Sequence, residues 1–215
     1  EPEMEYRQDE NGTVMLHYRG NGSIVLKATA MVDTDYDTHI TSDPPLTWKA
    51  LPSTPLTEAD ANISAEAQML ASGDSSLKTI RDLGNGVHDN IEYDISYWGT
   101  DKSAREVFSE RRGVCVEYTH LLISLARSLG FETRYVSGYV LAESWQPHAW
   151  AEIYVPDYGW LPADATFGQA GMLDSTHLAV RKSDDQSGAY DLLLSEDESA
   201  DVTAEDRVDM KFTSE

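Results

Sequence analysis

The most constraining feature of this sequence is an amphipathic helical segment followed directly by a series of short strands. Residues Val114–Leu129 carry apolar side chains at helical spacing and contain neither glycine nor proline. The segments that follow are rich in alternating, β-branched and aromatic residues, which predicts strands at 133–141, 149–155 and 160–162. A long helix that precedes consecutive strands is typical of an α+β domain.

The chain as a whole divides into three parts. Residues 1–60 are expected to form an N-terminal β extension that ends in a proline-bearing linker, 61–195 the α+β domain, and 196–215 an acidic C-terminal tail. Extension strands are predicted at 4–7, 13–19 and 23–32. Within the domain, helices are predicted at 64–71, 74–91 and 103–108, an extended segment at 93–98, and further strands at 178–180 and 190–194.

Composition excludes several classes of protein. Asp and Glu number 38 against 16 Lys and Arg, which gives a net charge of −22. Because nucleic-acid affinity is carried by Lys and Arg, binding to a phosphate backbone is excluded as the main function. The single cysteine allows neither an internal disulfide nor a Cys-cluster metal site. The sequence also lacks a run of 18 apolar residues, so we expect no transmembrane segment.

Cellular location is indicated only indirectly. The chain begins at Glu1 without an initiator methionine, which indicates a processed or trimmed product, and it carries Asn-x-Ser/Thr sequons at Asn11, Asn21 and Asn62. These features favour an extracytoplasmic or cell-surface segment. An acidic, lysine-poor surface is equally expected in a salt-rich cytoplasm, so both locations stay open, as does the oligomeric state.

The lone cysteine lies at the start of the long helix. On a period of 3.6 residues Cys115 shares a stripe with Tyr118, Leu122, Leu125 and Leu129, which places its sulfur at the edge of the buried face. Unpaired backbone N–H groups and the positive end of the helix dipole stabilise a thiolate, so we expect a lowered pKa for Cys115. The same N–H groups could hold an oxyanion. An inert core cysteine is the alternative.

A histidine and an aspartate follow at spacings that suit this thiol. His148 lies at the entrance of one predicted strand and Asp164 at the end of the next. If the two strands pair as an antiparallel hairpin across residues 156–159, both side chains lie near the same end of the pair. An imidazole there could accept the thiol proton, and the carboxylate could hold the ring in the productive tautomer.

These motifs resemble those of the transglutaminase-like superfamily. The similarity covers residues 74–168 and rests on Gly113-Val114-Cys115, on the segment His148-Ala149-Trp150-Ala151-Glu152, and on 159–166, which reads Gly-Trp-Leu-Pro-Ala-Asp-Ala-Thr. The resemblance implies a papain-like α+β core in which a catalytic helix packs on an antiparallel sheet. It also implies that Cys115 is the nucleophile, His148 the general base and acid, and Asp164 the orienting carboxylate. Relatives often carry proline after the aspartate, where this chain has Ala165.

Other candidate residues have weaker patterns. Trp150 shares a strand face with His148, and Trp98 precedes the catalytic segment, so both are candidates for substrate binding, with ordinary packing as the alternative. His120 should lie about 140° around the helix from the thiol and is expected to be structural. The remaining histidines, including His177, lack ligand spacing, so no metal is predicted. The Asp-rich run 33–37 lacks the Gly and Glu of an EF-hand loop and is interpreted as a solvated turn.

The function predicted from these residues is thiol-dependent acyl transfer on amide bonds of a protein or peptide substrate, without a cofactor. With water as acceptor the chain is a cysteine peptidase or amidase, which the compact size favours by analogy. With an amine as acceptor it is a protein-glutamine transglutaminase. A non-catalytic binding module of the same fold is the alternative from a different class.

Overall fold

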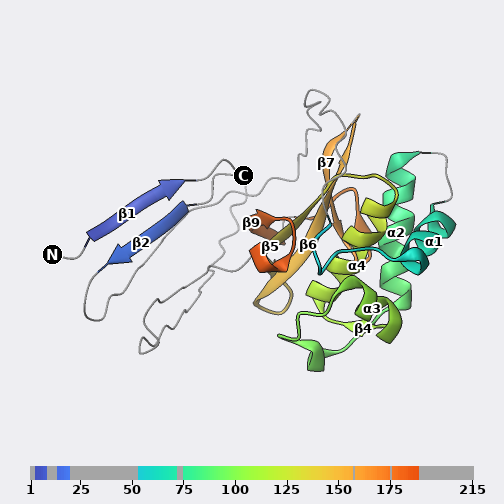
Figure 1. Cartoon of the computed structure of the whole chain (residues 1–215), viewed down its shortest axis with the longest axis horizontal. Coiled ribbons are helices and arrows are strands. Elements are labelled where there is room, and N and C mark those ends of the chain that lie inside the picture. The colour runs from blue at the N-terminus through green and yellow to red at the C-terminus, as the bar shows by residue number, and fades with distance from the viewer. Residues whose placement is uncertain are drawn as a thin grey trace.

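A five-stranded antiparallel sheet organises the computed structural model, which describes residues 3–8, 14–19, 53–71, 75–156, 158–174 and 176–188 (Figure 1). Its strand order is β8-β7-β6-β5-β9, and every neighbouring pair runs antiparallel. The strands are β5 (Thr133–Leu141), β6 (Trp145–Val155), β7 (Gly159–Asp164), β8 (Gln169–Ala170) and β9 (His177–Ser183).

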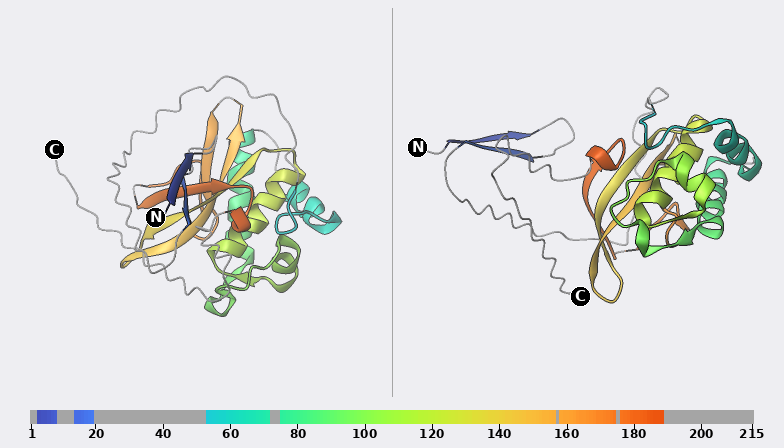
Figure 2. Two further views of the ribbon diagram at one scale, coloured as in Figure 1. Left: turned by 60° about the vertical axis from the view of Figure 1, so that its left-hand side comes forward. Right: turned by 60° about the horizontal axis from the view of Figure 1, so that its bottom comes forward.

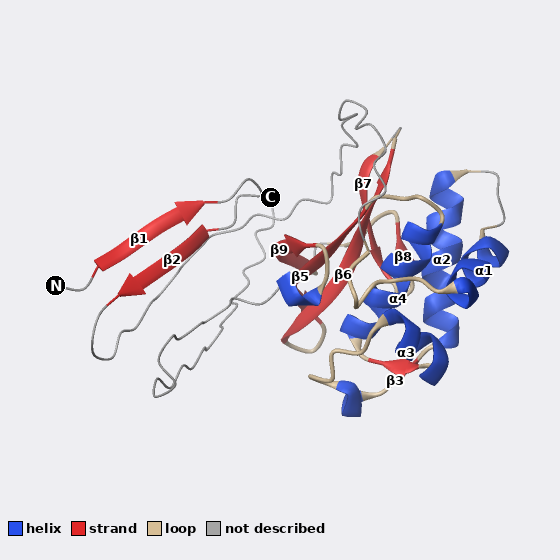
Figure 3. Ribbon diagram, in the orientation of Figure 1, coloured by secondary structure: helices blue, strands red, loops and turns tan. Residues whose placement is uncertain are grey.

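The helices of the described residues gather on one side of this sheet, as the right-hand view of Figure 2 and the colouring of Figure 3 show. They are α1 (Ala61–Leu70), α2 (Ser76–Asn90), α3 (Ala104–Glu110) and α4 (Cys115–Ser128). Helix α4 is the central one, since it packs against β5 and β6 and the other three helices pack against it. Its apolar residues and alternate residues of β6 share one hydrophobic core, which includes Leu121, Leu122, Leu125, Ala149, Ala151 and Ile153.

Shorter elements complete the described part of the chain. Strands β1 (Glu3–Gln8) and β2 (Val14–Arg19) form an antiparallel hairpin, and β3 (Glu92–Tyr93) pairs with β4 (Arg112–Gly113) in parallel. Two 3-10 turns are η1 (Ile95–Tyr97) and η2 (Gln186–Gly188). None of the helices within the described ranges has the length and apolar character needed to cross a membrane.

The predicted α+β class is confirmed, and so are the long helix, the strand at 133–141 and the 149–162 hairpin. The strand predicted at 149–155 begins earlier, at Trp145, and two other element predictions were also wrong. Helix α1 begins three residues early because the Asp60 carboxylate accepts the backbone N–H groups of Asn62 and Ile63. Segment 93–98 turns into η1 because the Asp94 side chain accepts the N–H of Ser96. The expected strands at 23–32 and 190–194, the Asp-rich run and the acidic tail lie outside the described residues.

Candidate active site

Cys115 begins helix α4, and a buried carboxylate fixes the turn that leads into it. Glu117 accepts the backbone N–H of Val114 at 3.0 Å and that of Lys102 at 3.3 Å. Gly113 is required beside this carboxylate, because a Cβ there would overlap the Cβ of Glu117. The glycine of the Gly-Val-Cys motif thus allows the Glu117 side chain to fold back over the helix start, which places the Cys115 thiol in the first turn.

His148 and Asp164 are joined by a hydrogen bond of 2.7 Å between Nε2 and Oδ2. Both side chains are buried. The second oxygen of Asp164 accepts the backbone N–H groups of Thr166 at 2.8 Å and Phe167 at 3.3 Å. The carboxylate is therefore fixed by the turn after β7, and its contact with Nε2 leaves Nδ1 as the ring nitrogen of His148 that remains for another partner.

The prediction that His148 stands at the entrance of its strand was wrong. Strand β6 begins at Trp145, and its ladder with β5 extends to the pair Leu141 and Trp145. The polar Gln146 and Pro147, whose residue type lacks a backbone N–H and is rare inside strands, make this part of the strand hard to recognise in the sequence. His148 consequently lies within a paired strand, opposite Gly138.

The sulfur of Cys115 lies beside the backbone of β6. The N–H of Ala149, the residue after His148, donates to it, as does the N–H of Val116 in the first turn of α4. Strand β7 pairs with β6 from Ala151 to Val155, so the Ala149 N–H is beyond that ladder. The Asp164 charge also acts on the thiol. These contacts bring the three predicted catalytic residues to one region of the fold.

The expected low pKa of the thiol was wrong. Burial raises the pKa of Cys115 to about 11, and the negative charges of Asp164 and Glu117 add to the effect. The N–H groups of Ala149 and Val116 oppose the shift and are outweighed. Helix-terminal donors are therefore present as predicted, but the sulfur is removed from water and faces two carboxylates, so the neutral thiol is the stable form near pH 7.

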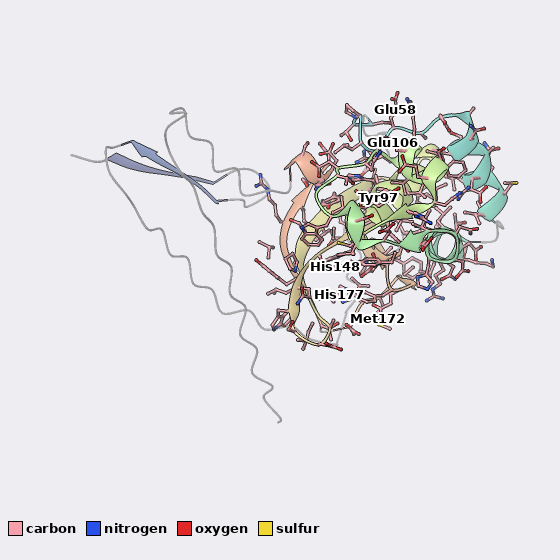
Figure 4. All side chains as sticks on the ribbon, turned by 90° about the horizontal axis from the view of Figure 1, so that it is seen from below. Glu58, Tyr97, Glu106, His148, Met172 and His177 are labelled. Atoms are coloured by element: carbon pink, nitrogen blue, oxygen red, sulfur yellow. The ribbon has the colours of Figure 1, made fainter. Side chains whose placement is uncertain are left out.

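A second histidine, His177, completes the cluster, and the sequence interpretation missed it. Its Nε2 lies 3.0 Å from Asp164 Oδ2, the oxygen that also contacts His148, and its Nδ1 lies 3.3 Å from Asp174 Oδ1. His148 and His177 lie next to each other in Figure 4, and their ring centroids are 5.9 Å apart. No local motif marks His177; only the pairing of β9 with β5 carries it to the site.

The two carboxylate contacts shift the ionisation of the cluster. Burial alone would raise the pKa of Asp164, but the hydrogen bonds from His148 and His177 outweigh it and lower that pKa to about 2. For His177, burial works to lower the pKa, and the hydrogen bonds and charges of Asp164 and Asp174 overcome it, so its pKa is raised. The ionised Asp164 carboxylate and a protonated His177 ring therefore stabilise each other.

Among the described residues, His148, Asp164 and His177 are the one group whose ligand atoms approach as metal ligands do, within 4.8 Å of one another. The distances from Asp164 Oδ2 to His148 Nε2 and to His177 Nε2, 2.7 and 3.0 Å, are typical of hydrogen bonds. In such bonds a proton lies between each nitrogen and the oxygen, where a metal would otherwise bind. We therefore assign a hydrogen-bonded cluster.

The two tryptophans singled out by sequence differ sharply in setting. Trp150 is buried, and its ring packs against His148 at 6.2 Å and edge-on against His177 at 5.4 Å between centroids. Trp98 is 56% exposed in the loop after η1. His120 is fully buried and contacts the carbonyl of Lys102 at 2.9 Å, in accord with a structural role.

Residues 63–165 match the model of the transglutaminase-like superfamily. This segment is a transglutaminase-like domain. The family match includes Cys115, His148 and Asp164 and ends one residue after the aspartate.

Curated relatives share this domain at low identity. An uncharacterized protein of Mycobacterium tuberculosis is 28% identical over 124 residues, which is 51% of this chain and 38% of that protein. A protein-glutamine gamma-glutamyltransferase of Pseudomonas aeruginosa is 30% identical over 80 residues, which is 32% of this chain and 12% of that protein. The chain thus spans less than half the length of these relatives.

A solved structure supports the fold of the transglutaminase-like domain. A candidate cysteine protease from Cytophaga hutchinsonii superposes with a TM-score of 0.51 at 23% identity, over 64% of this chain and 52% of that one. At this identity the likeness concerns the fold alone. It is in accord with the papain-like arrangement of helix and sheet expected from the sequence.

Proposed function

We propose that the transglutaminase-like domain catalyses thiol-dependent acyl transfer on amide bonds of peptides or proteins, with Cys115 as nucleophile, His148 as base and acid, and Asp164 as the orienting carboxylate. The observation that carries the proposal is the 2.7 Å bond between His148 and Asp164, together with the N–H that the next residue, Ala149, donates to the Cys115 sulfur. A nucleophile, a base and an orienting group arranged in this way are what acyl transfer requires.

The first half-reaction starts from a neutral thiol. His148 Nδ1 accepts the proton of Cys115 as the sulfur attacks the substrate carbonyl, and a C–S bond forms. Backbone N–H groups at the start of α4 are assigned as donors to the developing oxyanion. The His148 imidazolium then gives its proton to the departing amine, the C–N bond breaks, and a thioester on Cys115 remains.

The second half-reaction releases the acyl group. A water molecule gives one proton to His148 while its oxygen attacks the thioester, and the proton returns to the sulfur as the C–S bond breaks. Hydrolysis is the proposed outcome, which makes the domain a cysteine peptidase or amidase. Transfer to a primary amine is the second candidate, and the similarity to the gamma-glutamyltransferase of Pseudomonas aeruginosa favours it.

Mass spectrometry of a glutamine-containing peptide library tests both outcomes. The chain is incubated with the library alone and with a primary amine such as cadaverine. Hydrolysis gives cleaved or deamidated peptides in both samples, whereas amine transfer gives an adduct only with the amine. Cys115→Ala is the negative control, and Asp82→Asn, an exposed-helix change far from the thiol in sequence, controls for handling. A library unchanged in both samples contradicts the proposed function.

A further inference from the structure

Both ring nitrogens of His177 face carboxylate oxygens. Nε2 lies 3.0 Å from Asp164 and Nδ1 lies 3.3 Å from Asp174. Among the described residues, the ring makes one further polar contact, with the Thr176 hydroxyl at 3.4 Å from Nδ1. That hydroxyl donates its own hydrogen to Asp174, so towards His177 it is an acceptor.

The protonation state of the His177 ring follows from the hydrogen-bond donors and acceptors around it. An ionised carboxylate accepts hydrogen bonds and donates none, and the pKa of Asp164 and that of Asp174 are both lowered, chiefly by hydrogen bonds that outweigh burial. A neutral imidazole would turn one lone pair towards a negative oxygen. Only the doubly protonated ring satisfies both contacts, so His177 is an imidazolium between two carboxylates.

The fold holds His177 rigidly in this position. Strand β9 pairs with β5 so that His177 lies opposite Val140, and the register shifts between Ser137 and Gly138. A Cβ at Gly138 would overlap the carbonyl oxygen of Leu178, so the close approach of β9 depends on this glycine. The His177 side chain is only 4% exposed.

The cation shares its carboxylate oxygen with His148. Both Nε2 atoms contact Asp164 Oδ2, and the two rings are 5.9 Å apart. A positive charge on His177 partly neutralises Asp164, the carboxylate that His148 also contacts. A neutral His148 is the form that can accept the thiol proton.

We propose that His177 is a positioning residue of the thiol centre: as an imidazolium clamped between Asp164 and Asp174, it fixes the carboxylate oxygen that it shares with His148 and partly neutralises the charge of that carboxylate. The inference rests on the proposed function, because it assigns to His148 the role of base. The groups that face His177 among the described residues are Asp164 on β7, Asp174 before β9, His148 and Trp150 on β6, and Phe167 after β7.

The charge on His177 is measured directly by NMR of the full chain labelled with 15N in its histidine rings. At pH 7 we expect both nitrogens of one buried histidine to be protonated, and that signal to be absent from His177→Gln. A neutral His177 tautomer at pH 7 overturns the proposal.

Its effect on the centre is measured by the pH dependence of Cys115 alkylation with iodoacetamide, which needs no knowledge of the substrate. His177→Gln keeps an N–H that can reach Asp164 but removes the charge. We expect the acid limb, which is the low-pH part of the profile where the alkylation rate rises with pH, to move to higher pH by about one unit. The plateau at alkaline pH should be retained, as the sign of an intact fold. Asp174→Asn should move the limb in the same direction by less, since Asp174 is 44% exposed.

Two further variants make the outcomes distinguishable. Asp82→Asn, which alters an ion pair with Lys78 on α2, should leave the profile unchanged. His148→Ala should slow alkylation near pH 7 and leave only the tenfold rise per pH unit that a thiol with a pKa of about 11 shows by itself; if it does neither, the proposed function itself fails. If His148→Ala behaves as expected while His177→Gln matches the wild-type limb or moves it to lower pH, the role of His177 is overturned and the proposed function stands.

Discussion

The sulfur side and the imidazole side of the candidate centre lie in opposite electrostatic settings. Around Cys115, burial and two carboxylates resist the formation of a negative charge, and only backbone N–H groups favour it. Around His148 the charged forms are stabilised: Asp164 is ionised with its pKa lowered to about 2, and His177 has a raised pKa.

This difference bears on which group makes the Cys115 thiol reactive. Under the proposed function, a thiol held neutral near pH 7 becomes a nucleophile only as its proton moves to a base, and His148 is the group assigned to accept that proton. The contrast separates this arrangement from one in which a preformed thiolate faces an imidazolium. Each prediction below removes or titrates one side of it.

Removal of the sulfur should have the largest effect. Cys115→Ala is expected to abolish conversion of any substrate found in the peptide screen, a loss of at least about 10³-fold, because the covalent step has no nucleophile. Cys115→Ser should fall almost as far, since a hydroxyl is a weaker nucleophile in the same buried position. Turnover is followed by mass spectrometry, and residual activity within tenfold of wild type would contradict the role of Cys115.

Removal of the Asp164 charge should have the second-largest effect. Asp164→Asn is expected to lower turnover by about 10²- to 10⁴-fold, because a neutral amide neither fixes the His148 tautomer nor stabilises its imidazolium. The loss should appear in kcat more than in KM. Asp82→Asn, an isosteric change in an ion pair on the surface of α2, is the matched control and should be silent. Equal losses in the two variants would argue against a role in the centre.

The His148→Ala variant tests the ionisation of the Cys115 thiol without the neighbouring imidazole. With a pKa of about 11 against an ordinary 9.0, the folded thiol should be alkylated by iodoacetamide at pH 7 about 100-fold more slowly than the same variant unfolded in urea. Below pH 9 the rate should rise tenfold per pH unit. Equal rates for the folded and unfolded chains would show that the burial of Cys115 does not suppress its ionisation.

The sequence predicted what depends on local pattern. The apolar stripe of α4, the alternation of β5 and the turn between β6 and β7 are encoded within single segments, and with them the meeting of His148 and Asp164. Trp150 was placed correctly on the face of His148 for the same reason, since alternate residues of a strand share a face.

What depends on distant segments could not be read from the sequence. His177 reaches the site because β9 pairs with β5, about 40 residues earlier, across a register shift at Gly138. The thiol pKa follows from burial by other elements and from the folding back of Glu117, neither of which leaves a pattern around Cys115. Helix-terminal position alone therefore gave the wrong sign for its shift.

The stability of the folded chain should reflect the imidazole side in its pH dependence. The pKa of Asp164 is lowered from 3.8 to about 2, so its stabilisation is present above pH 4 and is lost as the pH falls towards 2. The pKa of His177 is raised from 6.5, so its stabilisation is present below that pH and is lost as the pH rises through the folded value. The combined contribution should be greatest between about pH 4 and 6.5.

Urea denaturation across this range measures the effect. The Asp164 contribution, a shift of nearly two pKa units on a fully buried side chain, corresponds to about 2 kcal/mol. His177→Gln should remove the decline on the alkaline side and leave the decline on the acid side in place. A wild-type profile without a maximum in this window would contradict the assigned charges.

Chelation should have the smallest effect. If the contacts of Asp164 with His148 and His177 are hydrogen bonds, a metal is not needed to hold the two rings on one carboxylate oxygen, and incubation with EDTA should change neither turnover nor the alkylation profile. Activity that disappears with EDTA and returns with Zn²⁺ would mean that a cation replaces those protons. The imidazole side would then owe its charge to a metal, and the contrast with the sulfur side would need a different explanation. Protein treated with EDTA, dialysed and then assayed without added metal serves as the control.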